Sequence, residues 1–388
     1  MIGPARTDTS VVGRWWWTVD WWTIAAIAVL MVIGIVLVMA ASPPVATRIG
    51  LPPFHFAQRQ AMFLAPALVV IAGVSMLGPQ GVRRLAIAGF GVAVVLAIAT
   101  LVFGDPVNGA RRWIHVGGVL VQPSEILKPT FAVISAVMLA AYQRTGDKKM
   151  GLASLGLLAF VLMLLAAQPD YGMATVVAAV WFTQFFIAGM PLRWVAAAGA
   201  AGAGLLTMAY VFVPHVASRI DRFLNPASGD NYQVETALNA FATGGALGRG
   251  PGEGVVKSVL PDAHTDFIFA VAGEEFGMVA GLLIVAAFAF VILRGFTRLL
   301  HEGNYFIVLA AGGLLAQFGL QAFVNMGVNL RLLPAKGMTL PFISYGGSSI
   351  LALALGMGMV LALTRRRSTT AQTRWMLDGG AQPSEAKA

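Results

Sequence analysis

The sequence predicts an all-α, polytopic membrane protein with about ten transmembrane helices and one long external (periplasmic) loop. Hydrophobic residues make up 58% of the 388 positions and charged residues only 11%, against about 25% in soluble domains. Ten apolar runs are long enough to cross the hydrocarbon core of a bilayer, and residues 214–266 contain none. The chain has no Cys, which excludes a disulfide framework and a thiolate metal site.

Residues 1–23 are predicted to form a cytoplasmic segment that ends in an aromatic belt. Tryptophans cluster there in the way that is typical of a headgroup interface. They are Trp15, Trp16, Trp17, Trp21 and Trp22. The apolar run that follows has the length and flanks of a retained signal anchor, and cleavage near residues 40–43 is the lesser alternative.

The predicted spans cover residues 24–41, 60–77, 85–103, 126–142, 151–167, 173–188, 194–213, 267–293, 305–326 and 348–364. A cytoplasmic N-terminus places 15 of the 26 Lys and Arg residues inside, and four of the others lie in the long loop, which the positive-inside rule discounts. An even number of spans returns the C-terminus to the cytoplasm, where 367–388 is predicted to be a disordered tail. Membrane orientation thus accounts for the net charge of +9, and no nucleic-acid partner is expected.

Four external segments carry more polar chemistry than a connector needs, and residues 104–128 and 168–172 are the first two. Arg112, beside Trp113, can match phosphate oxygens with its planar fork; the alternative is a surface-lying stretch that binds bulk anionic membrane lipids. Glu125 and Lys128 are three residues apart at the mouth of a predicted helix and share a face, so they either line a cavity or pair with each other. Asp170 lies in a short turn, where it either belongs to the site or only stabilises the turn.

The long loop exceeds the length of a plain connection and is therefore expected to be functional. Its glycine-rich part, residues 244–254, fits no nucleotide-binding pattern and is predicted to be mobile. Asp266 is the last polar residue before an apolar run, so its carboxylate is either a base at the membrane boundary or a helix cap. Glu274 and Glu275 lie inside that run, which indicates function; pointing about 100° apart, they are not expected to face one cavity.

Residues 332–349 combine two prolines, three glycines and three serines, which favours irregular backbone lining a cavity at membrane depth. Lys336, Ser344 and Ser348 are candidates to face that cavity. Ser344 is not in a nucleophile elbow. The five histidines, among them His264 beside Asp266, are scattered in the sequence, so no metal site is predicted.

Four stretches resemble, in order and spacing, the signatures of the SEDS family of shape, elongation, division and sporulation proteins. They are residues 108–128, 168–172, 260–277 (LPDAHTDFIFAVAGEEFG) and 333–349 (LPAKGMTLPFISYGGSS), and the resemblance extends over about residues 20–366. The last stretch is similar to that of the division member, because the elongation member usually has apolar residues where Lys336 stands. Residues 247–259 depart from the family pattern, with Glu253 and Val256 where an amide is more usual, which puts a role for their side chains in doubt.

The resemblance implies a ten-helix membrane domain at 24–366 that polymerises lipid II into glycan strands on the outer face of the cytoplasmic membrane. It also implies a class B penicillin-binding protein as the cross-linking partner, other division membrane proteins nearby, and a location at the septum. The family's catalytic position falls on Asp266. Its cavity positions fall on Arg112, Trp113, Glu125, Lys128, Lys336 and Ser344.

These residues suggest an inverting hexosyl transfer with one carboxylate. Asp266 would be the base for the acceptor hydroxyl, and Arg112, Lys128 and Lys336 would meet the charge of the departing pyrophosphate. Asp170, His264 and Ser348 complete the predicted substrate-binding set, and a divalent cation could share the charge. The alternatives are a lipid II flippase or other transporter that uses the same cavity, and a non-catalytic scaffold of the division machinery.

Overall fold

The computed structural model describes residues 8, 10–107, 110–116, 119–225, 231–334 and 337–366. Its membrane-length helices are α2 (Trp21–Arg48), α3 (His55–Ser75), α4 (Pro79–Phe103), α5 (Pro123–Thr145), α6 (Lys148–Ala167), α8 (Leu192–Phe212), α11 (Ile268–Leu299) and α12 (Tyr305–Asn329). Two shorter apolar helices, α7 (Tyr171–Ile187) and α13 (Gly347–Leu363), bring the total in the described part to ten. Each predicted span coincides with one of these helices, which confirms the polytopic helical fold.

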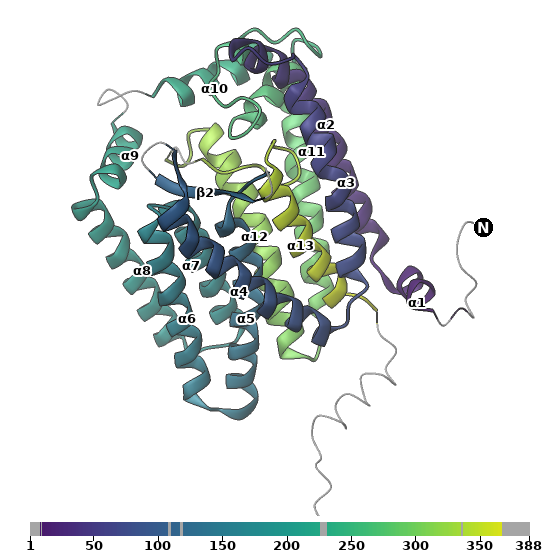
Figure 1. The fold of residues 1–388 in the computed structure, drawn as a ribbon, viewed down its shortest axis with the longest axis vertical. Coiled ribbons are helices and arrows are strands. Elements are labelled where there is room, and N and C mark those ends of the chain that lie inside the picture. Colours follow the sequence, from purple (N-terminus) through teal and green to yellow (C-terminus); the bar gives the residue numbers. More distant parts are fainter. Residues whose placement is uncertain are drawn as a thin grey trace, which may run out of the picture.

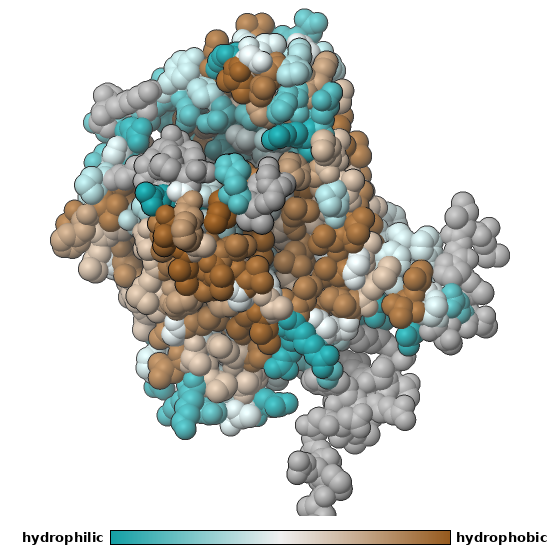
Figure 2. Space-filling model, viewed as in Figure 1, coloured by the Kyte–Doolittle hydropathy of each residue, from teal (hydrophilic) through white to brown (hydrophobic). Residues whose placement is uncertain are grey.

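The helices form a bundle with α5, α12 and α13 at its centre (Figure 1). Apolar residues of α5 and α13 that face neighbouring helices are fully buried, whereas α8 lies at the edge, contacts α7 and α9, and has almost no buried side chain. Figure 2 shows a broad apolar band across the middle of the visible face, with hydrophilic residues above and below it. This band has the distribution that a bilayer-spanning bundle requires.

The first and last described helices meet at one end of the bundle. The Arg366 N–H donates to the carbonyl of Thr18, at the end of α1 (Val11–Thr18), over 3.1 Å. Buried Asp20 accepts hydrogen bonds from Arg294 of α11 over 2.7 to 3.0 Å and lies 2.9 Å from Arg298. Both ends of the described bundle therefore lie on the same side, as an even number of spans demands.

A small sheet between α4 and α5 was not expected from the sequence. Strands β1 (Asp105–Val107) and β3 (Val119–Val121) each pair antiparallel with β2 (Ala110–Val116). The flanking strands are three residues long, too short to give an alternating pattern of polar and apolar residues that could be recognised. The strands pair main-chain groups where the chain leaves one helix for the next.

The long loop is largely helical, with α9 (Pro214–Leu224), α10 (Tyr232–Gly244) and the 3-10 turn η2 (Val256–Ser258). The prediction of a mobile glycine-rich segment was wrong. Helix α11 is broken at Gly277 (φ 78°), and the loop fills the break: Met278 N–H donates to Gly245 over 3.0 Å and Arg249 N–H to Glu274 over 3.0 Å. A Cβ at Gly248 (φ 83°) would collide with the Glu275 carbonyl, so glycine lets the loop approach this closely.

Glu274 and Glu275 hold the end of this loop. The Glu274 carboxylate accepts the main-chain N–H groups of Val255, Val256 and Lys257 at 2.6, 2.7 and 2.8 Å, and Glu275 forms an ion pair with the Lys257 ammonium. All of these carboxyl and ammonium groups are buried. The loop wraps around both acids, neither of which lines a cavity together with the other in the described structure, and their role here is structural.

We expect Glu274→Ala to lower the free energy of unfolding by about 2 to 4 kcal/mol, because three main-chain N–H groups lose a charged acceptor and a buried carboxylate is removed from its partners. Glu253→Ala, on the exposed side of the same loop, is the matched control and should change stability little. Thermal unfolding in detergent and limited proteolysis at residues 245–258 measure the effect. Equal stability of the two variants would show that Glu274 does not hold the loop.

Candidate active site

A cavity of about 360 Å³ lies at the end of the bundle opposite α1. Its walls come from α9, the start of α10, the turn before α11 and the irregular segment that follows α12. Asp266 lies in this wall together with three arginines, Arg219, Arg222 and Arg331. The cavity therefore combines one carboxylate with several cations at the edge of the membrane-spanning bundle.

The turn that carries Asp266 is tightly hydrogen-bonded. The N–H groups of Thr265 and Phe267 both donate to the Asp262 carbonyl, at 3.0 and 3.2 Å, and Asp262 itself has a positive φ of 52°. The N-cap of α11 is Phe267, and no side chain makes a cap hydrogen bond from that position. Asp266 is therefore not a helix cap, and its carboxylate is directed to the cavity.

The position of Asp266 changes its titration. Burial, and to a smaller extent the negative charge of Asp262, raise the pKa of the Asp266 carboxyl from its ordinary 3.8 to about 7. A carboxyl with this pKa is present in both protonation states near neutral pH, which is the property of an efficient general acid or base.

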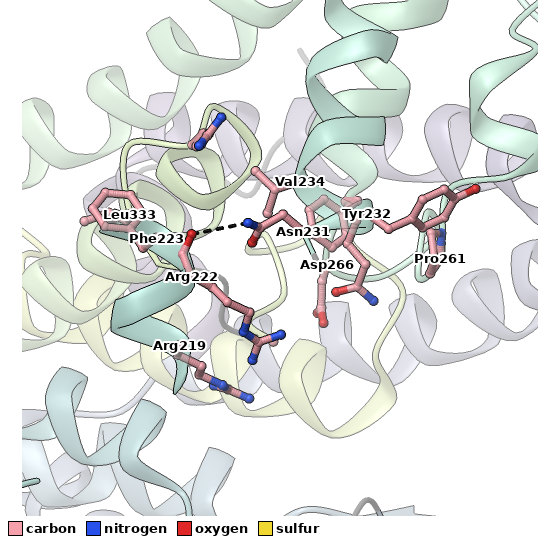
Figure 3. Close-up of a pocket in the computed structure, with 13 residues that line it drawn as sticks. Arg219, Arg222, Phe223, Asn231, Tyr232, Val234, Pro261, Asp266 and Leu333 are labelled. Atoms are coloured by element: carbon pink, nitrogen blue, oxygen red, sulfur yellow. Dashed lines mark hydrogen bonds between the residues drawn. The ribbon is translucent and has the colours of Figure 1, made fainter. Parts of the chain in front are cut away.

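The arginines of α9 were not anticipated from the sequence. Figure 3 shows the side chains of Arg219 and Arg222 extending from α9 toward the Asp266 carboxylate. Burial lowers the pKa of Arg219, the positive charges of Arg112 and Arg222 lower it further, and Asp170 acts in the opposite direction. Arg112 and Asp170 therefore lie close enough to Arg219 to act on it electrostatically. The available signal was the spacing of Arg219 and Arg222, three residues apart in an amphipathic part of the long loop.

Arg112 and Asp170 hold the turn between α6 and α7. Arg112 Nε donates to the Gln168 carbonyl over 3.1 Å and its Nη2 to the Pro169 carbonyl, while its Nη1 lies 3.8 Å from Asp170 Oδ1. Asp170 also caps α7 by accepting the Met173 N–H over 3.3 Å. Trp113, the next residue of β2, is half-buried. None of these three residues lines the cavity around Asp266.

Glu125 and Lys128 form a buried pair inside the bundle. Their charged atoms are 2.9 Å apart, and Lys128 Nζ also donates to Gln321 Oε1 over 3.1 Å. Of the two readings that the sequence left open, mutual pairing is the one that the structure shows, and neither residue lines the cavity around Asp266.

The predicted serines tie separate segments together. Ser344 Oγ donates to the Thr265 carbonyl, beside Asp266, over 2.5 Å and accepts the Leu340 N–H over 2.7 Å. Ser348 Oγ donates to the Leu120 carbonyl over 3.2 Å. Both hydroxyls therefore hydrogen-bond to main-chain groups of the protein. The Ser344 hydroxyl holds the turn that carries Asp266.

His264 lies within an aromatic cluster. Its ring is 4.0 Å from that of Phe56 and 5.5 Å from that of Tyr345, and burial lowers its pKa to about 4, so it is neutral at pH 7. Lys336 lies outside the described residues. Its neighbour Gly337 lines the cavity, with so little room that a Cβ there would be 3.0 Å from Asp266 Oδ2. No cluster of three or more His, Cys, Asp or Glu suited to a metal occurs in the described ranges.

The fold and cavity define a multi-spanning membrane protein whose candidate active site is one titratable carboxylate in an arginine-lined cavity at a membrane face. The profile of the cell cycle protein family of FtsW, RodA and SpoVE matches residues 20–369. The chain belongs to this family.

Two relatives and two solved structures show the range of the similarity. The probable peptidoglycan glycosyltransferase FtsW of Caulobacter vibrioides is 41% identical over 94% of this chain and 93% of its own length, and the FtsW of Acinetobacter baylyi is 38% identical over 86% of each. A chain from work on how a peptidoglycan synthase complex coordinates polymerization and crosslinking has a TM-score of 0.75 at 28% identity, over 89% of this chain and 97% of that one. Thermus thermophilus RodA has a TM-score of 0.66 at 27% identity, over 89% and 96%.

The raised pKa of Asp266 predicts a pH-dependent stability. Between pH 3.8 and about 7 the folded protein keeps a proton that the unfolded chain releases, so this contribution to stability is lost as pH rises through 7. Asp266→Asn removes the ionisation. We expect the variant to match wild type near pH 4 and to unfold at higher temperature than wild type at pH 8. Parallel melting curves from pH 5 to 8 would contradict the raised pKa.

Proposed function

We propose that this chain is a peptidoglycan glycosyltransferase that polymerises lipid II into glycan strands during septal cell-wall synthesis. The observation that carries the proposal is the Asp266 carboxyl, with a pKa of about 7, in a cavity that it shares with three arginines at one face of the bundle. The names of the sequence relatives and the peptidoglycan synthase complex among the structural relatives support it.

The residues suit a direct displacement. Ionised Asp266 takes the proton from the acceptor sugar hydroxyl as the hydroxyl oxygen attacks the anomeric carbon of the donor. The bond from that carbon to the pyrophosphate oxygen breaks, and the polyprenyl pyrophosphate leaves with both bonding electrons. A single displacement inverts the anomeric centre, and the site has no second carboxylate lining the cavity beside Asp266 among the described residues.

The leaving pyrophosphate needs positive charge at the membrane edge. Arg219, Arg222 and Arg331 provide guanidinium groups, which match phosphate oxygens in shape and charge. Lys336, beside cavity-lining Gly337 in the sequence, remains a candidate from the family resemblance. Arg112 and Lys128 have protein partners, and we assign them the support of the cavity wall. A divalent cation brought with the pyrophosphate would share the charge, and chelation during the assay tests this.

The charge distribution supports an orientation with both termini in the cytoplasm and the cavity outside. The family relationship supports a place in the inner membrane at the division septum. A polymerase there produces strands that a second enzyme must cross-link. We therefore propose a class B penicillin-binding protein as the partner, with other division membrane proteins nearby. The solved peptidoglycan synthase complex supports a partnership of this kind.

Purified protein should form glycan chains from lipid II, and Asp266→Asn should reduce the rate by about 10² to 10⁴, the usual contribution of general-base catalysis. The wild-type rate should rise with pH through about 7, because the ionised carboxylate is the active form. Glu253→Gln, which alters an exposed acid outside the cavity, is the control for loss of a carboxyl group. A near wild-type rate for Asp266→Asn would exclude Asp266 as the base.

The same membranes should be scored for lipid II transport, which separates the remaining functions. Transport without polymer by wild-type protein would favour a flippase. Neither activity, with division partners still bound, would favour a scaffold. Polymer formation by wild type excludes both as the sole function.

Neutralising the cavity cations should slow the reaction. We expect Arg219→Gln and Arg331→Gln each to lower the turnover number by about 10- to 100-fold, because leaving-group charge loses a partner in a partly dehydrated cavity. Arg84→Gln makes the same charge change at an exposed position of α4 near the other membrane face and should be neutral. Equal small effects of all three would mean that the arginines only attract anionic lipid.

A further inference from the structure

Helix α12 carries four buried amide side chains on an otherwise apolar face. Gln317, Gln321, Asn325 and Asn329 follow one another at intervals of four residues, and each is 4% exposed or less. Residues four apart lie above one another on a helix, so the amides form one stripe that leads from the core to the cavity. Buried amides are unfavourable unless they find partners, which raises the question of what each amide binds.

The last two amides bind the main chain of Asp266. The Nδ2 groups of Asn325 and Asn329 donate to the same Asp266 carbonyl oxygen over 2.8 and 2.9 Å. Asn325 Nδ2 also donates to the Met338 carbonyl over 2.6 Å. One side chain thus joins the turn that carries Asp266 to the irregular segment that forms the opposite wall of the cavity.

Asn329 performs the capping that Asp266 does not. Its Oδ1 accepts the N–H of Ala270, in the first turn of α11, over 3.1 Å. Helix starts favour a carboxylate or amide oxygen at such N–H groups. Because Asn329 supplies that oxygen from α12, the Asp266 carboxylate need not turn back on its own helix and stays directed to the cavity.

The orientation of Asn325 shows that it acts as a donor. Two carbonyl oxygens lie on one side of its amide, so the NH₂ group must face them. Its Oδ1 is buried with no hydrogen-bond partner within the described ranges.

We propose that Asn325 and Asn329 are positioning residues that fix the Asp266 carboxylate in the cavity by holding its main-chain carbonyl. The proposal rests on the proposed role of Asp266 as the base. Neither asparagine touches the substrate; both act through Asp266, and Asn325 also sets the distance between the Asp266 turn and the segment at Met338. Loss of either donor lets the turn move and the carboxylate leave its productive geometry, for which small displacements cost large factors in rate.

The test compares Asn325→Leu and Asn329→Leu with Gln317→Leu. The substitutions are similar in shape and chemistry, and Gln317 lies on the same stripe, has an unpaired buried Oε1 and does not contact the Asp266 turn. We expect each asparagine variant to lower kcat for lipid II polymerisation by about 10- to 100-fold with KM changed less than about threefold. Gln317→Leu should leave both unchanged.

The pH dependence of kcat and of the melting temperature distinguishes a positioning role of the asparagines from a general loss of folded structure. If the turn loosens and water reaches the carboxylate, the midpoint of the kcat profile should move about one pH unit toward acid in the asparagine variants. The charges that face Asp266 are unchanged in all variants: Asp262 in its own turn, Arg219 and Arg222 from α9, and Arg331 after α12. The pH dependence of the melting temperature should move in the same direction, and this readout does not require activity.

The outcomes are distinct. A kcat loss with unmoved pH midpoints, or one equalled by Gln317→Leu, overturns the positioning role. Inactive wild-type protein overturns the proposed function, and the melting profiles then still decide whether the asparagines govern the ionisation of Asp266. If a leucine variant yields no folded protein, Asn325→Ser and Asn329→Ser take its place, because a buried hydroxyl is tolerated but is too short to reach the Asp266 carbonyl.

Discussion

Main-chain N–H and C=O groups at membrane depth must find partners within the protein, and this constraint shapes the outer end of the bundle. Two long segments there, residues 245–267 and the described parts of 330–346 (330–334 and 337–346), are not regular helix. Each is held by side chains from neighbouring helices: Glu274 of α11 binds the N–H groups of Val255 to Lys257, and Asn325 of α12 binds carbonyls of both segments. The cavity exists because helices satisfy these segments, which therefore need not collapse onto each other.

This arrangement gives the Asp266 carboxylate its chemical character. Its turn is closed by hydrogen bonds to the main chain, and the first turn of α11 is served by Asn329. The Asp266 carboxylate therefore caps no helix. It is buried and lies near Asp262, and both effects raise its pKa to about 7. The same surroundings that disfavour its charge in the resting protein make it a stronger base toward a substrate hydroxyl. Stability and reactivity at this position are thus in opposition.

The ten helices could be predicted because length and hydropathy alone decide which segments cross a bilayer. What could not be predicted depends on contacts between distant residues. Nothing local shows that the loop would fill a break at Gly277, or that Glu274 would bind N–H groups 17 to 19 residues before it. The stripe from Gln317 to Asn329 was visible as amides at helical spacing in an apolar run, but its target on the Asp266 carbonyl was not. Arg331 lies just beyond that run, and only the fold brings it to the cavity.

The family signatures supply part of the cavity lining, Asp266 among it, and the long loop supplies another part. Arg112, Glu125, Lys128 and Ser344 have protein partners and join β2, α5, α12 and the Asp266 turn, whereas Arg219 and Arg222 come from the long loop. This division explains why the chain can depart from the family pattern at Val256: the group that Glu274 binds there is the main-chain N–H, which every residue except proline supplies. The exposed residue Glu253 can differ from the family pattern for the same reason, because the loop is held through its backbone. The loop therefore tolerates a change of side chain where its main-chain atoms make the contact. At Asn325 and Asn329 of α12 the side-chain amide itself makes the contact, so these positions require an amide.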